Sequence, residues 1–244
     1  FEKQKDHYEA LRNALGELAS IPVTEAKKPL VGIVGEIYVR TNNYANENVI
    51  AAIERGGGEA WLAPMHEWII YTSYMQSWLA RRHRFNVIER GESLLKNIYL
   101  FDSERTYYRL AGRFLGDRHE PEMEEIMKAA EEYLPLDFMG EAVLTVGRTI
   151  LFARQGAKMV INCAPFGCMP GTITTGIFGE LQARLGIPIV NQFYDGEGDL
   201  NKKIGSYLTN IPLCETYDVP ERKREDEIRL AKKENKIFLT PLHL

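Results

Sequence analysis

The chain has 244 residues, of which 45% are hydrophobic and 26% charged, as in an ordinary globular protein with a sizeable core. Its formal net charge of −4 argues against the basic surface of a general nucleic-acid binder. No apolar run approaches the roughly 18 residues of a membrane span, and three cysteines are too few for a disulfide scaffold, so we expect a cytoplasmic protein. Because the chain begins at Phe1, we expect a processed product or a piece of a longer protein.

The first part of the chain predicts one strand–helix–strand unit behind an N-terminal helix. Apolar side chains at helical spacing and an unbroken apolar run distinguish the two kinds of element. The elements are, in order, a helix over 2–19, a linker over 21–28, a strand over 30–36 ending at Gly35-Glu36, a polar loop over 40–43, a helix over 46–55 and a strand over 60–63. Such a unit should be parallel and right-handed.

The middle of the chain, residues 66–134, predicts a helical insertion rich in aromatic residues. Helices packed over the sheet would explain the three- and four-residue spacing of these rings. Alternatively, part of the aromatic surface covers a substrate pocket or docks a partner. The run Arg81-Arg82-His83-Arg84 forms a basic cluster, which is typical of a solvated helix face and, less often, of an anion site.

The second half predicts the rest of one parallel sheet. Its elements are a helix over 140–155, a strand over 159–161, a loop holding Cys163 and Cys168, a helix over 172–186, a strand over 187–192 and a helix over 201–208. The fold class is therefore α/β, a Rossmann-like doubly wound sheet of four parallel strands in the order 2-1-3-4, with an extra helical layer. We expect an N-terminal helix and linker (1–28), the α/β domain (29–213) and a charged C-terminal tail or helix (214–244).

Ligands bind beyond the carboxyl ends of the strands in such sheets, at the point where the strand order reverses. Three predicted loops converge there, and their reactive or acidic side chains are Glu36, Cys163, Cys168, Asp195, Glu197 and Asp199. Free cysteine is often a core residue, but two cysteines in a Pro/Gly-rich loop are equally consistent with a functional thiolate. Cys214 lies beyond the predicted sheet, and we interpret it as a stray cysteine or a weak metal candidate.

Thiolates are the ligands of iron–sulfur clusters. None of the five histidines lies in these loops, which argues against zinc and against Cys–His catalysis. Neither a P-loop nor a complete GxGxxG fingerprint occurs, and the acidic run after the last strand lacks the spacing of a calcium loop.

Two segments carry a resemblance to a known family. They are LVGIVGEIYVRTNNYANENVIAAIERGGGEAWLAP at residues 30–64 and INCAPFGCMPGTITTGIFGELQARLGIPIVNQFYDG at residues 161–196. The chain resembles the 2-hydroxyacyl-CoA dehydratase and benzoyl-CoA reductase subunit superfamily, and more closely its activase-related members, the CoA-substrate-specific enzyme activases. The PFGCMPG loop is the most specific element, and the resemblance extends over roughly residues 28–208.

The resemblance implies Rossmann-like domains in which cysteines from more than one domain hold an iron–sulfur cluster, of the 4Fe–4S kind, in an inter-domain cleft. An ATP-dependent activator protein would supply low-potential electrons under anaerobic conditions. Carried over residue by residue, Cys168 is a cluster ligand and Cys163 a weaker second ligand. The cleft-lining positions are Glu36, Asn42, Pro165, Phe166, Gly167 and Asp195. The chain departs from the dehydratase pattern in having one such domain and no cysteine before Cys163.

The sequence leaves three functions open. The first is a domain of an iron–sulfur-dependent acyl-CoA dehydratase or reductase system, working with another domain or subunit and with the activator. The second is a non-catalytic docking or regulatory module, in which the cysteine loop is structural. The third is a small-ligand domain that uses the basic cluster at residues 81–84 for an anion such as a CoA phosphate.

Overall fold

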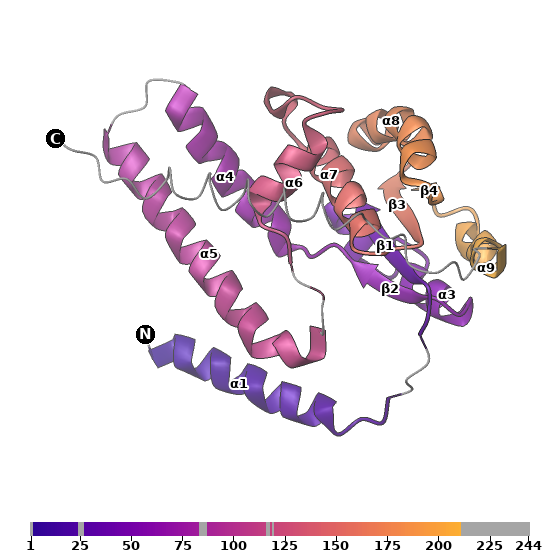
Figure 1. Ribbon diagram of the computed structural model, residues 1–244, viewed down its shortest axis with the longest axis horizontal. Coiled ribbons are helices and arrows are strands. Elements are labelled where there is room, and N and C mark those ends of the chain that lie inside the picture. The colour runs from indigo at the N-terminus through magenta and orange to yellow at the C-terminus, as the bar shows by residue number, and fades with distance from the viewer. Residues whose placement is uncertain (1, 24–26, 83–86, 116–117, 119, 211–244) are drawn as a thin grey trace, which may run out of the picture. The chain divides into compact units, whose positions relative to one another are not determined.

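The computed structural model describes residues 2–23, 27–82, 87–115, 118 and 120–210. Its centre is a four-stranded, all-parallel sheet in the order β2-β1-β3-β4, which confirms the predicted Rossmann-like α/β fold and strand order (Figure 1). The charged tail predicted over 214–244 lies outside the described residues, as does Cys214. Within the described part of the chain, no helix is long and apolar enough to cross a membrane.

The strands are β1 (Leu30–Gly35), β2 (Glu59–Leu62), β3 (Met159–Pro165) and β4 (Ile189–Tyr194). The two central strands, β1 and β3, are almost wholly buried because helices cover both of their faces. β3 runs to Pro165 rather than ending near residue 161, so the prediction that Cys163 lies in a loop is wrong. Cys163 stands inside the strand, in register with Gly35 of β1 and Gln192 of β4.

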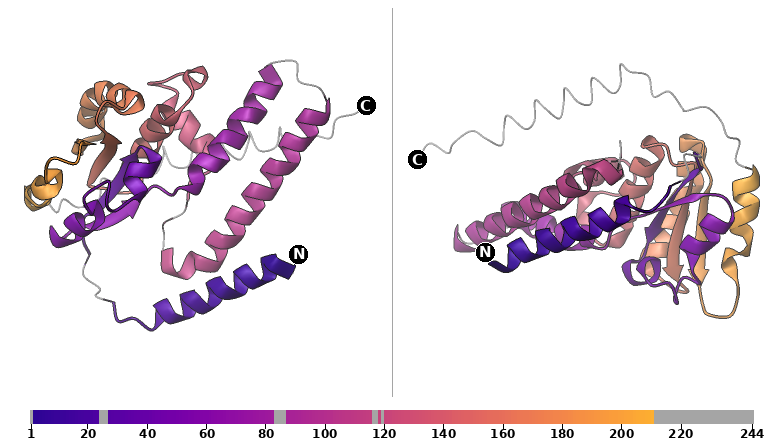
Figure 2. Two further views of the ribbon diagram at one scale, coloured as in Figure 1. Left: turned by 180° about the vertical axis from the view of Figure 1, so that it is seen from behind. Right: turned by 90° about the horizontal axis from the view of Figure 1, so that it is seen from below.

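Helices cover the two faces of the sheet as right-handed crossovers require. On one face, α3 (Val49–Arg55) packs against β2 and against α9 (Ile204–Asn210). On the other face, α7 (Glu141–Arg154) contacts β1 and β3, and α8 (Met169–Leu185) contacts β3 and β4 (Figures 1 and 2). The short elements are α2 (Ile37–Thr41), the 3-10 turns η1 (Leu136–Phe138) and η2 (Leu200–Lys203), and α6 (Met123–Ala130).

α7 is the most deeply buried helix of the described chain, with every residue from Ala142 to Phe152 buried. The sheet, α6 and α8 all contact it. Gly147 permits this packing, because a Cβ atom at that position would overlap the carbonyl oxygen of Ile126 in α6. The core therefore depends on a close approach of two helix backbones.

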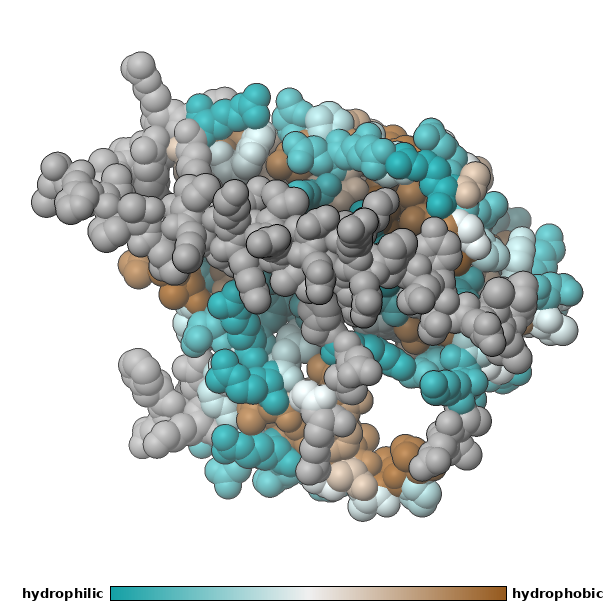
Figure 3. All heavy atoms as spheres, in the orientation of Figure 1, coloured by the Kyte–Doolittle hydropathy of each residue, from teal (hydrophilic) through white to brown (hydrophobic). Residues whose placement is uncertain are grey.

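The predicted helical insertion consists mainly of α4 (His66–Arg82) and α5 (Val87–Leu115), which pack against each other (Figure 2). α4 contributes Ile70, Tyr71 and Met75 to the core itself. Its aromatic side chains Trp68, Tyr74 and Trp78 are partly buried and pack against that core. α1 (Glu2–Ala19) contacts α5, where the rings of Tyr8 and Tyr107 lie 5.2 Å apart. The surface over α1 shows polar and apolar residues side by side (Figure 3).

The predicted basic cluster is described only in part. The Arg82 guanidinium lies over the ring of Trp78, 5.0 Å from its centroid, as on a solvated helix face. His83 and Arg84 lie outside the described residues, and so does the side chain of Arg81.

Because α6 and α7 approach closely at Gly147, a single methyl group added there should strongly destabilise the folded chain. We expect Gly147→Ala to lower the free energy of unfolding by about 1–3 kcal/mol, because the helices must move apart. The matched control is Gly179→Ala in α8, where an added Cβ meets nothing within 4 Å and improved helix propensity should stabilise the chain by up to ~1 kcal/mol. Urea denaturation of both variants checks this, and equal stabilities would contradict the packing argument.

Candidate functional site

The loops that leave the carboxyl ends of β1, β3 and β4 meet at one edge of the sheet, as predicted. Within the described residues, the non-glycine residues with positive φ are Glu47 (53°), Asn48 (57°) and Met139 (56°). The first two lie in the loop after α2, and Met139 precedes Glu141, whose carboxylate reaches the amide of Ile37 just beyond β1. Strained backbone of this kind concentrates at functional sites, so this edge is the candidate site.

Glu36 fixes the path of the chain as it leaves β1. Its amide donates to the carbonyl of Cys163 (2.8 Å), and its carboxylate accepts from the amides of Tyr38 (3.0 Å) and Val39 (2.8 Å), which caps α2. Gly35 has φ +110°, and a Cβ atom there would overlap the backbone of Cys163. The predicted polar loop over 40–43 is therefore partly a helix, because the capping carboxylate satisfies its first amides.

Asparagine side chains hold the following loop in place. Asn42 accepts from the amides of Tyr44 and Ala45, and buried Asn46 donates to the carbonyls of Val39 and Arg40. Asn201, from η2, donates to the carbonyls of Asn46 and Glu47. These bonds offset the cost of the left-handed residues and give the loop one defined conformation.

An open groove of about 1000 Å³ runs between this loop and the segment after β4. Its charged lining is acidic, with Arg55 as the exception: Glu36, Glu47, Glu197 and Asp199. Of the predicted cleft residues, Glu36 and Pro165 line the groove. Asn42, Phe166, Gly167 and Asp195 lie in the same set of loops, and Asp195 accepts a bond from the amide of Glu197 (2.9 Å).

The two thiols of the predicted site have different surroundings. Cys163 is completely buried, and its Sγ lies 3.8 Å from the hydroxyl of Tyr194. Burial raises the pKa of the Cys163 thiol to about 12, against a smaller opposing effect of the bond to Tyr194. Tyr194 itself bonds to Gln192 and Asn201, so Cys163 belongs to a packed network that ties β3 to β4.

Cys168 is partly exposed at the N-cap of α8, and its side chain makes no capping bond. Its amide donates to the carbonyl of Pro165 (3.1 Å), which closes a turn in which Gly167 has φ +77°. Phe166 and Met169, on either side of this turn, expose 79% and 69% of their surface. The Pro/Gly-rich sequence thus presents this thiol at the surface, among exposed apolar side chains.

Within the described residues, no group of three or more His, Cys, Asp or Glu side chains is placed to hold a metal ion. Of the two predicted ligands, Cys168 suits a metal that another domain helps to bind. Cys163 suits a structural thiol, because its sulfur is enclosed and already contacts Tyr194.

Two carboxylates stand close together beside β1. Glu141, at the start of α7, accepts from the amide of Ile37 (3.5 Å), next to Glu36. Burial, followed by the charge of Glu36, raises the pKa of Glu141, while the bond from Ile37 opposes the shift. This pair was not predicted, since the sequence separates the two residues by 105 positions.

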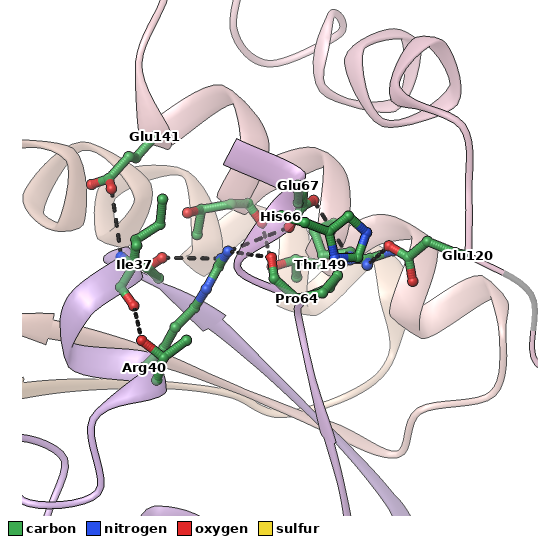
Figure 4. A network of polar contacts seen from close by, with 12 residues as sticks. Ile37, Arg40, Pro64, His66, Glu67, Glu120, Glu141 and Thr149 are labelled. Carbon is green, nitrogen blue, oxygen red and sulfur yellow. Dashed lines mark hydrogen bonds and ion pairs between the residues drawn. The ribbon is translucent and has the colours of Figure 1, made fainter. Parts of the chain in front are cut away.

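A buried chain of ion pairs links this edge to the helical insertion (Figure 4). Arg40 donates to the carbonyls of Gly35 and Pro64 (both 3.2 Å) and pairs with Glu67 (3.4 Å). Arg148 lies between Glu67 (3.6 Å) and Glu120. Both arginines and Glu67 are at most 2% exposed. The sequence signal that could have indicated this buried network is Arg148, which interrupts the apolar run VLTVGRTILF at residues 143–152.

Comparisons of the chain with protein-family models, with curated proteins and with solved structures give no significant match. The resemblance described above therefore rests on the two sequence segments alone.

The different burial of the two thiols predicts selective alkylation. In a Cys214→Ser background at pH 8, iodoacetamide should modify Cys168 and spare Cys163, which is enclosed and stays protonated at its raised pKa. Peptide mass spectrometry measures both sites, and the chain unfolded in guanidinium, where both should react, is the control. Equal rates in the folded protein would contradict this description.

The shifted carboxyl of Glu141 predicts a pH dependence of stability. A raised pKa means that the folded chain holds the proton more tightly than the unfolded chain does. The advantage of the wild type over Glu141→Gln should therefore be largest below the ordinary pKa of 4.5 and decline as pH rises through the raised value. Urea denaturation between pH 4 and 7 measures the free energy of unfolding of both proteins. A difference between them that stays constant over this range would contradict the prediction. When Glu36→Gln is added to both proteins, the stability difference between them should change less steeply with pH. The pH dependence that remains should be the part caused by burial of Glu141.

Proposed function

We propose that this chain is a domain of an anaerobic, iron–sulfur-dependent acyl-CoA dehydratase or reductase system, and that it supplies the Cys168 thiolate to a cluster shared with another domain or subunit. The observation that carries the proposal is the position of Cys168. It lies in the PFGCMPG turn, partly exposed, where the central strand β3 passes into α8. Ligands of this fold class bind at that edge of the sheet.

The described residues fit one cluster ligand rather than a complete set. Cys168 would hold the group by its sulfur, and the positive end of the α8 dipole would favour the negative charge of a thiolate-bound cluster. Cys163 would not contribute, because its sulfur is enclosed. When bound, an iron–sulfur cluster supplies one-electron transfer at low potential. The remaining ligands would come from the partner, as the family resemblance implies.

The carboxyl edge of the sheet carries exposed aromatic and methionine side chains. Tyr38 of α2 and Tyr44 of the loop that follows it line the groove and expose 63% and 94% of their surface, and Phe166 and Met169 are similarly exposed. Exposed aromatic and methionine side chains gathered at one edge favour contact with another protein surface. Closing that edge would also remove water from the Cys168 sulfur.

The same exposed aromatic and methionine side chains favour a second candidate, a docking or regulatory module that binds no cluster. In that case the partner would cover the carboxyl edge of the sheet and Cys168 would be one contact among several. The two functions differ in a single measurable property, the binding of iron through Cys168.

We would test this by anaerobic reconstitution with ferrous iron and sulfide in excess dithiothreitol, whose thiols can complete a partial ligand set. We expect iron and acid-labile sulfide to bind with a broad visible absorption band, and Cys168→Ala to lose both. Cys163→Ala and Cys214→Ser are the matched controls and should retain them. An iron-free wild type, or iron retained in Cys168→Ala, would overturn cluster binding and leave the docking module as the function.

A further inference from the structure

A second cavity, of about 340 Å³, lies between α5 and the segment that leads into α6. One face of α5 forms its first wall, with residues at three- and four-residue spacing from Phe101 to Leu115. Arg118, Glu120, Pro121 and Glu122 supply the opposite side. This volume is within the range of small-molecule sites. The residues discussed for the carboxyl-edge groove take no part in this cavity.

Gly112 keeps the cavity open. It lies inside the 29-residue helix α5, where glycine costs about 1 kcal/mol relative to alanine. It lines the cavity, and a Cβ atom at this position would meet nothing within 4 Å. Neither backbone conformation nor close packing therefore requires glycine there. Any larger side chain would begin to fill the cavity.

Three arginines line the cavity, Arg105, Arg109 and Arg118, and the guanidinium of Arg118 also lies over the ring of Trp61, 5.5 Å from its centroid. Arg105 pairs with Glu122 and Arg118 with Glu59, but all four side chains are at least 39% exposed, so these pairs are weak and exchangeable. Arg109 forms no ion pair with any described residue.

Three carboxylates line the cavity as well, and one of them, Glu122, pairs with the lining residue Arg105. Glu120 pairs with buried Arg148, and Glu104 lies 2.8 Å from the ring of His66. The charge of Glu120 is matched by Arg148 from behind the wall, whereas that of Glu104 is matched only when His66 is protonated. An incoming anion would meet one guanidinium that has no ion pair among the described residues and two that are weakly paired.

The rest of the wall is apolar or aromatic: Phe101, Tyr108, Leu115 and Pro121. We propose that this cavity binds a small organic anion, with a carboxylate or phosphate head at Arg109 and Arg118 and an aromatic or branched apolar body between α5 and Pro121. This site goes beyond the proposed function and does not depend on a cluster at Cys168.

The probes are phenylacetate and phenyl phosphate, which share an aromatic body and differ in the anionic head, and phenylacetamide, the neutral isostere of phenylacetate. Titration of the full chain, followed by calorimetry or ligand-observed NMR, should show binding of at least one anion with a dissociation constant below about 1 mM. Phenylacetamide should bind about tenfold more weakly than phenylacetate, because a charged hydrogen-bonding partner is lost. Whichever of the two anions binds more tightly shows whether the site prefers a carboxylate or a phosphate head.

Two variants assign the binding to this cavity. Gly112→Leu should abolish it by filling the space, whereas Gly91→Leu makes the same change in the same helix, at an exposed position with nothing within 4 Å, and should leave it unchanged. Arg109→Gln should remove the preference for the anion over the amide. The proposal is overturned if no probe binds, if Gly112→Leu binds as the wild type does, or if the amide binds equally well. Circular dichroism establishes that the variants are folded.

Discussion

The buried ion pairs of Arg40, Glu67, Arg148 and Glu120 are the interaction on which the arrangement of this molecule depends. They join the ends of β1 and β2 to α4, to the centre of α7 and to the segment before α6. Two positive and two negative groups alternate, so the buried charge is balanced. Burying such groups costs free energy that hydrophobic residues would not cost. In the observed placement of the helical insertion, each of these four charges has a partner of opposite sign.

This geometry matters for the carboxyl edge of the sheet. Arg40 holds the carbonyl of Gly35, immediately before Glu36, and Glu36 in turn caps α2 and bonds to the backbone of Cys163. The asparagine-bonded loop after α2 then forms one wall of the groove. The insertion is thus connected to the candidate site by direct polar contacts, although its helices lie far from Glu36 in the sequence.

The cysteine loop illustrates how burial separates residues of the same type. Five positions apart, Cys163 is enclosed beside Tyr194, and Cys168 is partly exposed between the exposed residues Phe166 and Met169. Strand pairing explains the difference. Continuation of the ladder with β4 as far as Pro165 places Cys163 inside the sheet, and the turn at Gly167 brings Cys168 out of it. Only an exposed thiol can be shared with another domain.

The sequence by itself determined the sheet, its strand order and the edge at which the loops meet, because apolar runs, helical spacing and the handedness of crossovers are local or topological properties. It also identified Glu36, Pro165 and Cys168 as residues of that edge. Only the tertiary structure decided the rest. The length of β3 depended on hydrogen bonds from β4, and the Glu36–Glu141 pair depended on α7 beginning beside β1. The ion pairs and the cavity at Gly112 join residues from separate helices and loops. Such contacts arise from packing between distant segments, and no periodicity in the sequence encodes them.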